Sequence, residues 1–185
     1  MQPIQDTLAD IIQVGLVTTD VDGHPLTRMS NACQFCQLMA SSPSGRQACI
    51  ASWRRLGQLP EREPHFLTCH AGLAYARARI EVSVSSVSSL VAGQFYASPP
   101  DPQELAQRTE YLAAAHHLSQ EQLAAAAARL PVLDQRAQSR VGEWLSKIAR
   151  AFEEIGRERQ AFMNRLSRIA ALSNLETYRS RPPLQ

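Results

Sequence analysis

The four cysteines are the most chemically distinctive residues of this 185-residue chain, and all of them fall between positions 33 and 69. Cys33 and Cys36 form a C-x-x-C pair, which Cys49 and Cys69 follow. A C-x-x-C pair lets two thiolates reach one ion, and four thiolates complete the ligand set of structural zinc or of an iron–sulfur cluster. The pattern therefore predicts a zinc or iron–sulfur centre held by these four residues. Two alternatives stay open: redox-active thiols, and small buried side chains without reactivity.

Enzyme signatures are missing from the sequence. It contains no glycine-rich phosphate loop, no nucleophile elbow and no H-E-x-x-H motif. Cys69 and His70 are neighbours in the chain, whereas a nucleophile and its base normally meet through the fold. We therefore expect a binding protein and not an enzyme.

The composition indicates a folded protein without a nucleic-acid surface. Hydrophobic residues make up 44% of the chain and charged residues 19%, and the formal net charge is +2. This balance supports a buried core, and so small a charge does not by itself indicate nucleic-acid binding. No apolar run approaches the roughly 18 residues that span a bilayer, and the N-terminus has no signal-peptide pattern. We expect a cytoplasmic protein whose thiols stay reduced.

The predicted secondary structure changes near residue 98, from mixed helices and strands to helices alone. The first part has helical spacing over 2–12, then a strand (14–19), a turn at Asp20 to Gly23 and a second strand beginning near Pro25. Helices are expected over 33–39 and 44–59, the latter capped by Ser44. Strands are expected over 65–68, 78–89, with a turn near Ser85, and 89–96. The proline-rich segment 98–102 then separates an α+β domain (1–98) from a helical region (99–185).

A long helix from about 133 to 178 is the clearest periodic feature. Its apolar residues are spaced alternately four and three apart: Val141, Leu145, Ile148, Phe152, Ile155, Phe162, Leu166 and Ile169. Only Arg159 interrupts this heptad pattern, and one polar core position can set register or oligomeric state. The pattern predicts a homodimeric coiled coil, and the alternative is a helix that lies on its own domain.

Four ordered segments resemble those of the PocR-type sensory domain. They are FCQL at 35–38, SSPSGRQAC at 41–49, CHAGL at 69–73 and AGQF at 92–95, and the turn at Asp20 to Gly23 is similar to the family's opening hairpin. The resemblance covers about residues 3–97. It implies a PAS-like antiparallel sheet, a role in bacterial transcription regulation or signalling, and small hydrocarbon derivatives such as diols as ligands. The positions that it carries over are Cys36, Cys49, Cys69, His70, Gly72, Gly93 and Gln94.

The resemblance leads us to expect a sensory domain that binds a small molecule, a metal centre or both. The candidate ligand-binding residues are His70, Gln94, Tyr75, Phe95 and Trp53. Ligand binding is expected to change the pose of the dimeric C-terminal helix. Two other functions stay open: a redox or metal sensor in which the cysteines themselves respond, and a dimerisation adaptor without a ligand. No output module is recognisable after residue 100, so the output is expected on another chain or elsewhere in a longer regulator.

Overall fold

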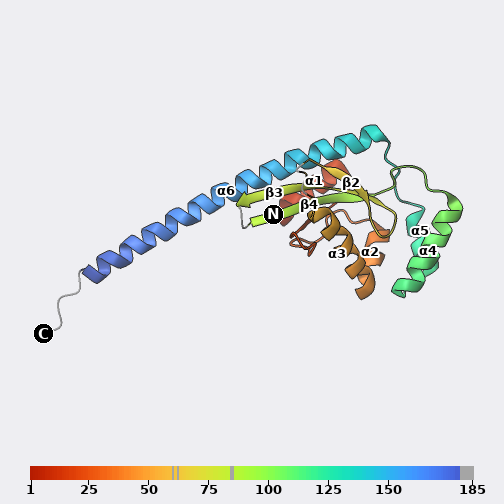
Figure 1. Ribbon diagram of the computed structural model, residues 1–185, viewed down its shortest axis with the longest axis horizontal. Helices are drawn as coiled ribbons and strands as arrows, with labels where there is room; N and C mark the ends of the chain where they lie inside the picture. The colour runs from red at the N-terminus through yellow and green to blue at the C-terminus, as the bar shows by residue number, and fades with distance from the viewer. Residues whose placement is uncertain (60, 62, 84–85, 180–185) are drawn as a thin grey trace.

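A computed structural model describes every residue except 60, 62, 84–85 and 180–185, with the backbone alone for 173–179. The elements in chain order are α1 (Gln2–Ile12), β1 (Gly15–Thr19), α2 (Gln34–Ser41), α3 (Pro43–Gly57), β2 (His65–Thr68), β3 (Ala74–Ser83), β4 (Ser86–Phe95), α4 (Pro102–His116), α5 (Gln120–Ala127) and α6 (Gln135–Arg179). These elements confirm the predicted α+β class, with one antiparallel sheet, flanking helices and a long C-terminal helix (Figure 1).

The sheet has the strand order β1-β4-β3-β2, and every neighbouring pair is antiparallel. The strand predicted over 78–89 is in fact parts of two strands, because β3 ends at Ser83 and β4 begins at Ser86, on either side of the position where the turn was predicted. The alternation of valine and serine continues into β4, so the period of two residues alone does not separate the two strands. The predicted turn residue Ser85 itself lies outside the described residues.

The expected strand near Pro25 was also wrong, since only single bridges from Thr19 to Pro25 and from Leu16 to Ser30 form there. Pro25 has no amide hydrogen to donate to a ladder. The backbone amide of Thr18 donates to the Thr27 hydroxyl at 2.8 Å, so a side chain takes the place of a strand carbonyl.

The helix cap predicted at Ser44 lies two residues earlier. Ser42 caps α3 by accepting a hydrogen bond from the amide of Gly45 at 2.9 Å. Pro43 occupies the first helical position, where its fixed φ and missing donor are tolerated. The Ser44 hydroxyl instead lies 3.0 Å from Nδ1 of His116, which joins the start of α3 to the end of α4.

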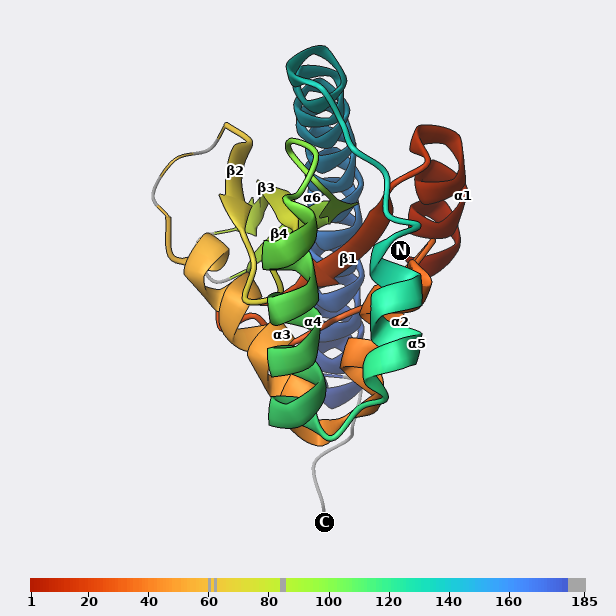
Figure 2. The ribbon, with the colours of Figure 1, turned by 90° about the vertical axis from the view of Figure 1, so that its right-hand side faces the viewer.

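The two faces of the sheet are covered by different helices (Figures 1 and 2). Alternate residues of β3 and β4 pack against the first half of α6, with Leu90 and Ala92 among them. On the opposite face Tyr75 and Val91 pack against Leu56 of α3. A third hydrophobic cluster joins α2, α4 and α5 at one end of the sheet. Each strand therefore carries one set of side chains toward α6 and another toward α3.

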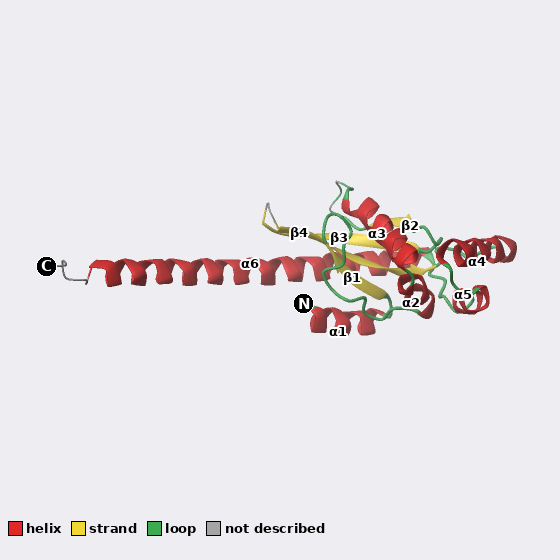
Figure 3. Cartoon of the chain, turned by 90° about the horizontal axis from the view of Figure 1, so that it is seen from below, coloured by secondary structure: helices red, strands yellow, loops and turns green. Residues whose placement is uncertain are grey.

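The heptad pattern of α6 is divided between two environments. Its first four seam residues are buried in the core against the sheet, so this half of the helix lies on its own domain: Val141, Leu145, Ile148 and Phe152. The later seam residues are exposed, because α6 continues well past the sheet (Figure 3): Ile155, Phe162, Leu166 and Ile169. We call these four residues, together with Arg159, the distal seam.

The helix leaves the sheet at the tip of the β3–β4 hairpin. A Cβ atom on Gly156 would overlap the side chain of Val82, so only glycine allows this approach. The Glu153 carboxylate accepts a hydrogen bond from the Glu81 amide at 2.8 Å, and Arg157 donates to the Glu81 carbonyl at 3.1 Å. These contacts hold α6 against the hairpin where its covered half ends.

Contacts cross the predicted boundary at residue 98. Tyr96 exchanges backbone hydrogen bonds with Pro131 and Leu133 at 2.9 and 3.0 Å, and its side chain belongs to the cluster formed with α4 and α5. The two parts also share hydrophobic clusters. The division into two domains stays a prediction. None of the described helices combines the length and the apolar character required to cross a bilayer.

Candidate ligand-binding pocket

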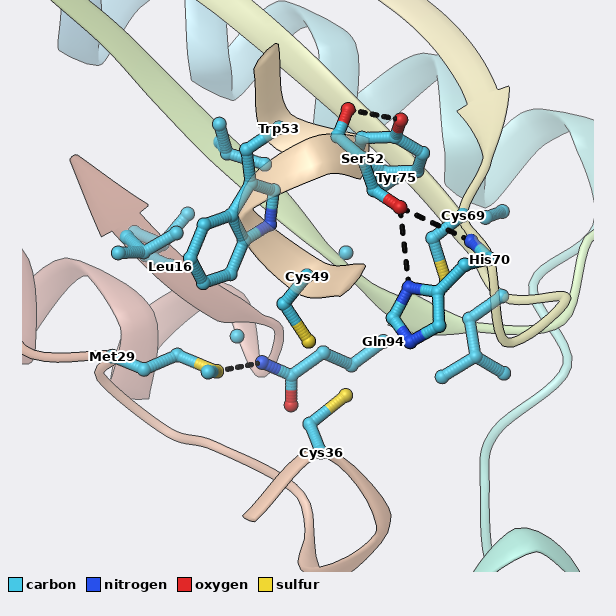
Figure 4. Close-up of a pocket in the computed structure, with 16 residues that line it drawn as sticks. Leu16, Met29, Cys36, Cys49, Ser52, Trp53, Cys69, His70, Tyr75 and Gln94 are labelled. Atoms are coloured by element: carbon cyan, nitrogen blue, oxygen red, sulfur yellow. Dashed lines mark hydrogen bonds between the residues drawn. The ribbon is translucent and has the colours of Figure 1, made fainter. Parts of the chain in front are cut away.

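A cavity lies between the sheet and the helices α2 and α3 (Figure 4). The space inside it that the centre of a water-sized molecule can reach is about 60 Å³, so the cavity is small and suits a ligand of few non-hydrogen atoms. None of its lining residues is Asp, Glu, Lys or Arg: they are Gly15, Leu16, Val17, Met29, Cys36, Cys49, Ser52, Trp53, Cys69, His70, Leu73, Ala74, Tyr75, Val91, Gly93 and Gln94. The cavity is thus an apolar space with a few polar groups.

His70 presents a free ring nitrogen at this cavity. The turn that carries it is closed by the Gly72 amide, which donates to the Cys69 carbonyl at 2.9 Å, and Gly72 has a φ of 82°. The Ser52 hydroxyl accepts from the His70 amide at 3.1 Å and lies 3.2 Å from Nδ1. The buried Nε2 atom has no hydrogen-bond partner among the described residues. A buried polar atom without a partner is costly, so Nε2 is available to a ligand.

Electrostatics keep His70 neutral. Burial, together with repulsion from His116 and Arg55, lowers the pKa of His70 to about 4. The Ser52 oxygen already accepts one hydrogen bond, and its own proton can be donated to Nδ1. This arrangement favours the tautomer that carries the ring proton on Nε2, which would make Nε2 a hydrogen-bond donor toward the cavity.

Trp53 and Tyr75 supply aromatic walls. Trp53 projects from α3 toward the cavity, and Tyr75 lines it from β3 (Figure 4). The Tyr75 hydroxyl is already engaged, because it donates to the Ser52 carbonyl at 2.6 Å. Burial raises the pKa of Tyr75, so its phenol stays neutral. Tyr75 therefore contributes a ring and a fixed position for α3 rather than a free polar group.

Gln94 faces the cavity because β4 contains a bulge. Ala74 pairs with Phe95 and Tyr75 pairs with Gly93, so Gln94 is the extra residue, and its φ is 80°. A bulge of this kind breaks the alternation of side chains along a strand. Gln94 consequently points into the cavity, whereas Phe95 turns to the α6 side.

Phe95 is the one candidate ligand residue that does not line this cavity. It is fully buried in the core cluster that includes α6, and its ring centroid lies 6.1 Å from that of Phe66. Regular alternation along the strand would have placed it beside Val91 on the cavity side. The left-handed backbone at Gln94 reverses that placement.

The Gln94 side chain ties three segments together. Its Oε1 accepts from the Cys33 amide at 2.6 Å, and its Nε2 lies 2.8 Å from the Met29 sulfur. Its amide occupies the space where a Cβ on Gly15 would be, which explains a glycine at the start of β1. Sequence reasoning missed the roles of Gly15, Met29 and Ser52, because none belongs to a motif with a chemical signature.

The cysteines gather at the cavity. Cys36, Cys49 and Cys69 line it, and Cys33 caps α2 behind it. Among the described residues, no group of three or more His, Cys, Asp or Glu side chains is placed to hold a metal ion. Burial raises the pKa of Cys49 to about 12 and also raises that of Cys69, so without a bound ion both side chains are thiols near neutral pH. Metal binding by the four cysteines therefore stays a prediction.

A four-stranded antiparallel sheet with helices on both faces and a cavity on one defines a PAS-like sensory domain. A family model described as the sensory domain found in PocR matches residues 1–157, so the chain belongs to this family, as the sequence resemblance predicted. The match extends past residue 97 and ends at Arg157, where α6 leaves the sheet. Comparisons with curated proteins and with solved structures gave no match.

We expect His70 to destabilise the fold in acid. The pKa of His70 is about 4 in the folded protein, and an unfolded histidine titrates near pH 6.5. Between these values the unfolded chain binds a proton at this position that the folded chain does not, so stability falls as the pH drops from about 6.5 to about 4. Melting temperatures measured from pH 7.5 to 4.5 should fall less steeply in His70→Asn than in the native protein. Equal slopes would contradict the assignment.

Proposed function

We propose that the chain is a sensory domain that binds a small, uncharged, partly apolar molecule in this cavity. The main support for ligand binding is the buried Nε2 atom of His70. His70 lines the apolar cavity, and its Nε2 has no hydrogen-bond partner among the described residues. Isolated polar groups in apolar pockets are what orient small ligands. Family membership supports a sensing role.

The cavity favours neutral ligands over ions. It offers no charged side chain as a counter-ion, and desolvating an unpaired charge is costly. Short alcohols and diols, which the resemblance implies, combine a hydroxyl that can accept from His70 with carbon that can contact Trp53 and Val17. The Gln94 amide lies close enough to the same space to meet a second hydroxyl.

Binding is a better account of Ser52 and His70 than catalysis. The two side chains lie within hydrogen-bond distance, as a nucleophile and base would. In a catalytic triad, however, the second ring nitrogen is oriented by a carboxylate, and here Nε2 has no partner among the described residues. The Ser52 hydroxyl instead accepts a hydrogen bond from the His70 amide and positions the ring.

The strands provide the route from the cavity to α6. Tyr75 and Val91 face the cavity, and their neighbours Ala76 and Leu90 pack in the core against α6. A ligand that binds one pose of these strands more tightly than another would shift α6 between two poses. In this proposal the distal seam pairs with the same seam of a second copy of the chain. A change in the pose of α6 would then alter the arrangement of the two helices in the dimer.

The test is a binding measurement with a variant that removes only the cavity-facing nitrogen. Purified protein is screened by thermal shift against short alcohols, diols, aldehydes and carboxylic acids, since a ligand that binds only the folded state stabilises it. His70→Asn keeps an amide where Nδ1 meets Ser52 and deletes Nε2. Loss of one hydrogen bond should weaken the best ligand by roughly 2- to 12-fold.

His65→Asn is the matched control, because His65 is exposed on β2 and should bind the ligand as the native protein does. The absence of any shift across the panel would favour a dimerisation adaptor without a ligand. Equal affinity in His70→Asn and the native protein would remove His70 from the site.

A further inference from the structure

Cys33 and Cys36 lie at the N-terminus of α2, where their backbone and side-chain atoms are hydrogen-bonded to each other. Cys33 is the N-cap residue, and its sulfur accepts the Cys36 amide hydrogen at 3.4 Å. The Cys36 thiol also hydrogen-bonds the Cys33 sulfur. Both cysteines are unpaired and partly exposed. Two thiols are thus in contact at a helix N-terminus, where the helix dipole favours negative charge.

The two thiols differ sharply in acidity. The hydrogen bond from Cys36, together with backbone amides of the first helical turn, lowers the pKa of Cys33 to about 7. The same hydrogen bond and burial raise the pKa of Cys36. Cys33, which caps the helix, is therefore the more acidic of the two thiols. This is the asymmetry that a reactive cysteine and its resolving partner require.

We propose that Cys33 and Cys36 form a reversible oxidation site that reacts with hydroperoxides and closes to a disulfide. This goes beyond the ligand binding proposed above. The Cys33 thiolate attacks a peroxide oxygen, the O–O bond breaks, and the departing hydroxide takes up a proton and leaves as water when the oxidant is hydrogen peroxide. Cys33 is then a sulfenic acid. The Cys36 sulfur attacks it, the S–O bond breaks, and the thiol proton leaves with the hydroxide as a second water.

The oxidation site is connected to the ligand cavity. Cys36 lines the cavity, and the amide of Cys33 is held by Gln94, which also lines it. A disulfide would draw the Cys36 sulfur toward Cys33 and change the wall of the cavity. Oxidation would thereby alter the affinity of the cavity for its ligand, which gives the domain a second input.

The experiment uses the full chain and hydrogen peroxide, followed by alkylation, trypsin digestion and mass spectrometry. Trypsin leaves Cys33 and Cys36 together in peptide 29–46, and it places Cys49 in 47–54 and Cys69 in 63–77. The proposed bond should therefore lower the mass of one peptide by about 2 Da, the loss of two hydrogens on forming a disulfide. Bonds to Cys49 or Cys69 would instead join two peptides. Iodoacetamide at pH 7 should label Cys33 at least about 100-fold faster than Cys49 in the reduced protein.

Three variants decide the roles of the two sulfurs. Cys33→Ser retains a good helix cap and should abolish the disulfide. Cys36→Ser should leave a sulfenic acid on Cys33 that a dimedone probe traps. Cys49→Ser is the matched control and should close the bond as the native protein does. Peptide 29–46 staying reduced in peroxide, or bonds mainly to Cys49 or Cys69, would overturn the proposal. No ligand takes part in this experiment, so its failure would leave the proposed ligand binding untouched.

Discussion

Replacing Leu145 with alanine is expected to lower the free energy of unfolding by about 2–5 kcal/mol, as for other fully buried leucines. Leu145 has an exposed fraction of 0% and lies in the core cluster between the sheet and the first half of α6. Removing its outer carbons would leave a cavity between two elements that cannot easily close on it. Urea denaturation followed by circular dichroism, at one fixed protein concentration, measures the effect.

Leu26→Ala provides the matched control for this prediction. The exposed fraction of Leu26 is 61%, so the same chemical change should alter the free energy of unfolding by no more than about 0.5 kcal/mol. If the two variants were equally stable, the first half of α6 would not belong to the core. The result would also decide whether residues 135–157 fold with the sensory domain, as the extent of the family match indicates.

The double substitution Phe162→Asp and Leu166→Asp should convert the proposed dimer to monomers. Phe162 and Leu166 are consecutive positions of the distal seam, with exposed fractions of 60% and 44% in the single chain. Each apolar side chain buried in a dimer contributes roughly 1.5–3 kcal/mol, and the double substitution removes two from each copy. The dissociation constant should therefore rise at least about 1000-fold. Analytical ultracentrifugation of the full chain measures it.

A control with the same added charge separates the seam from a general effect of negative charge on the helix. Gln160 and Asn164 lie away from the seam and hydrogen-bond each other at 3.1 Å. Gln160→Asp with Asn164→Asp should leave the dimer intact. A native protein that sediments as a monomer at tens of micromolar would refute dimerisation through α6, and it would leave the ligand cavity as a separate proposal.

The seam shows what periodicity can and cannot predict. Heptad spacing from Val141 to Ile169 predicted a long helix with one apolar face, and α6 has that face. The pattern could not say what covers it, because a sheet and a partner helix both select apolar residues at the same spacing. Only the fold shows that Leu145 meets a sheet and Phe162 does not.

Residue type was enough to predict which polar and aromatic residues are candidates for the site. It was not enough where the backbone conformation determines the direction of a side chain. His70, Tyr75, Trp53 and Gln94 line one cavity, and their role in binding a ligand stays a prediction. Phe95 does not line it, because a bulge depends on strand register, which no single residue type encodes. The cap at Ser42 was missed although the sequence favours it: proline is suited to the first helical position, so Pro43 makes Ser42 the capping residue.

The contact between Gly156 and Val82 makes the free half of α6 a lever with its pivot on the sheet. From Gly156 to the helix end at Arg179 the rise of 1.5 Å per residue gives an arm of about 35 Å. A tilt of about 5° at the pivot would move the far end by about 3 Å, roughly half of the spacing between successive helical turns. Displacements too small to break any contact in the core would thus become large where the arm ends.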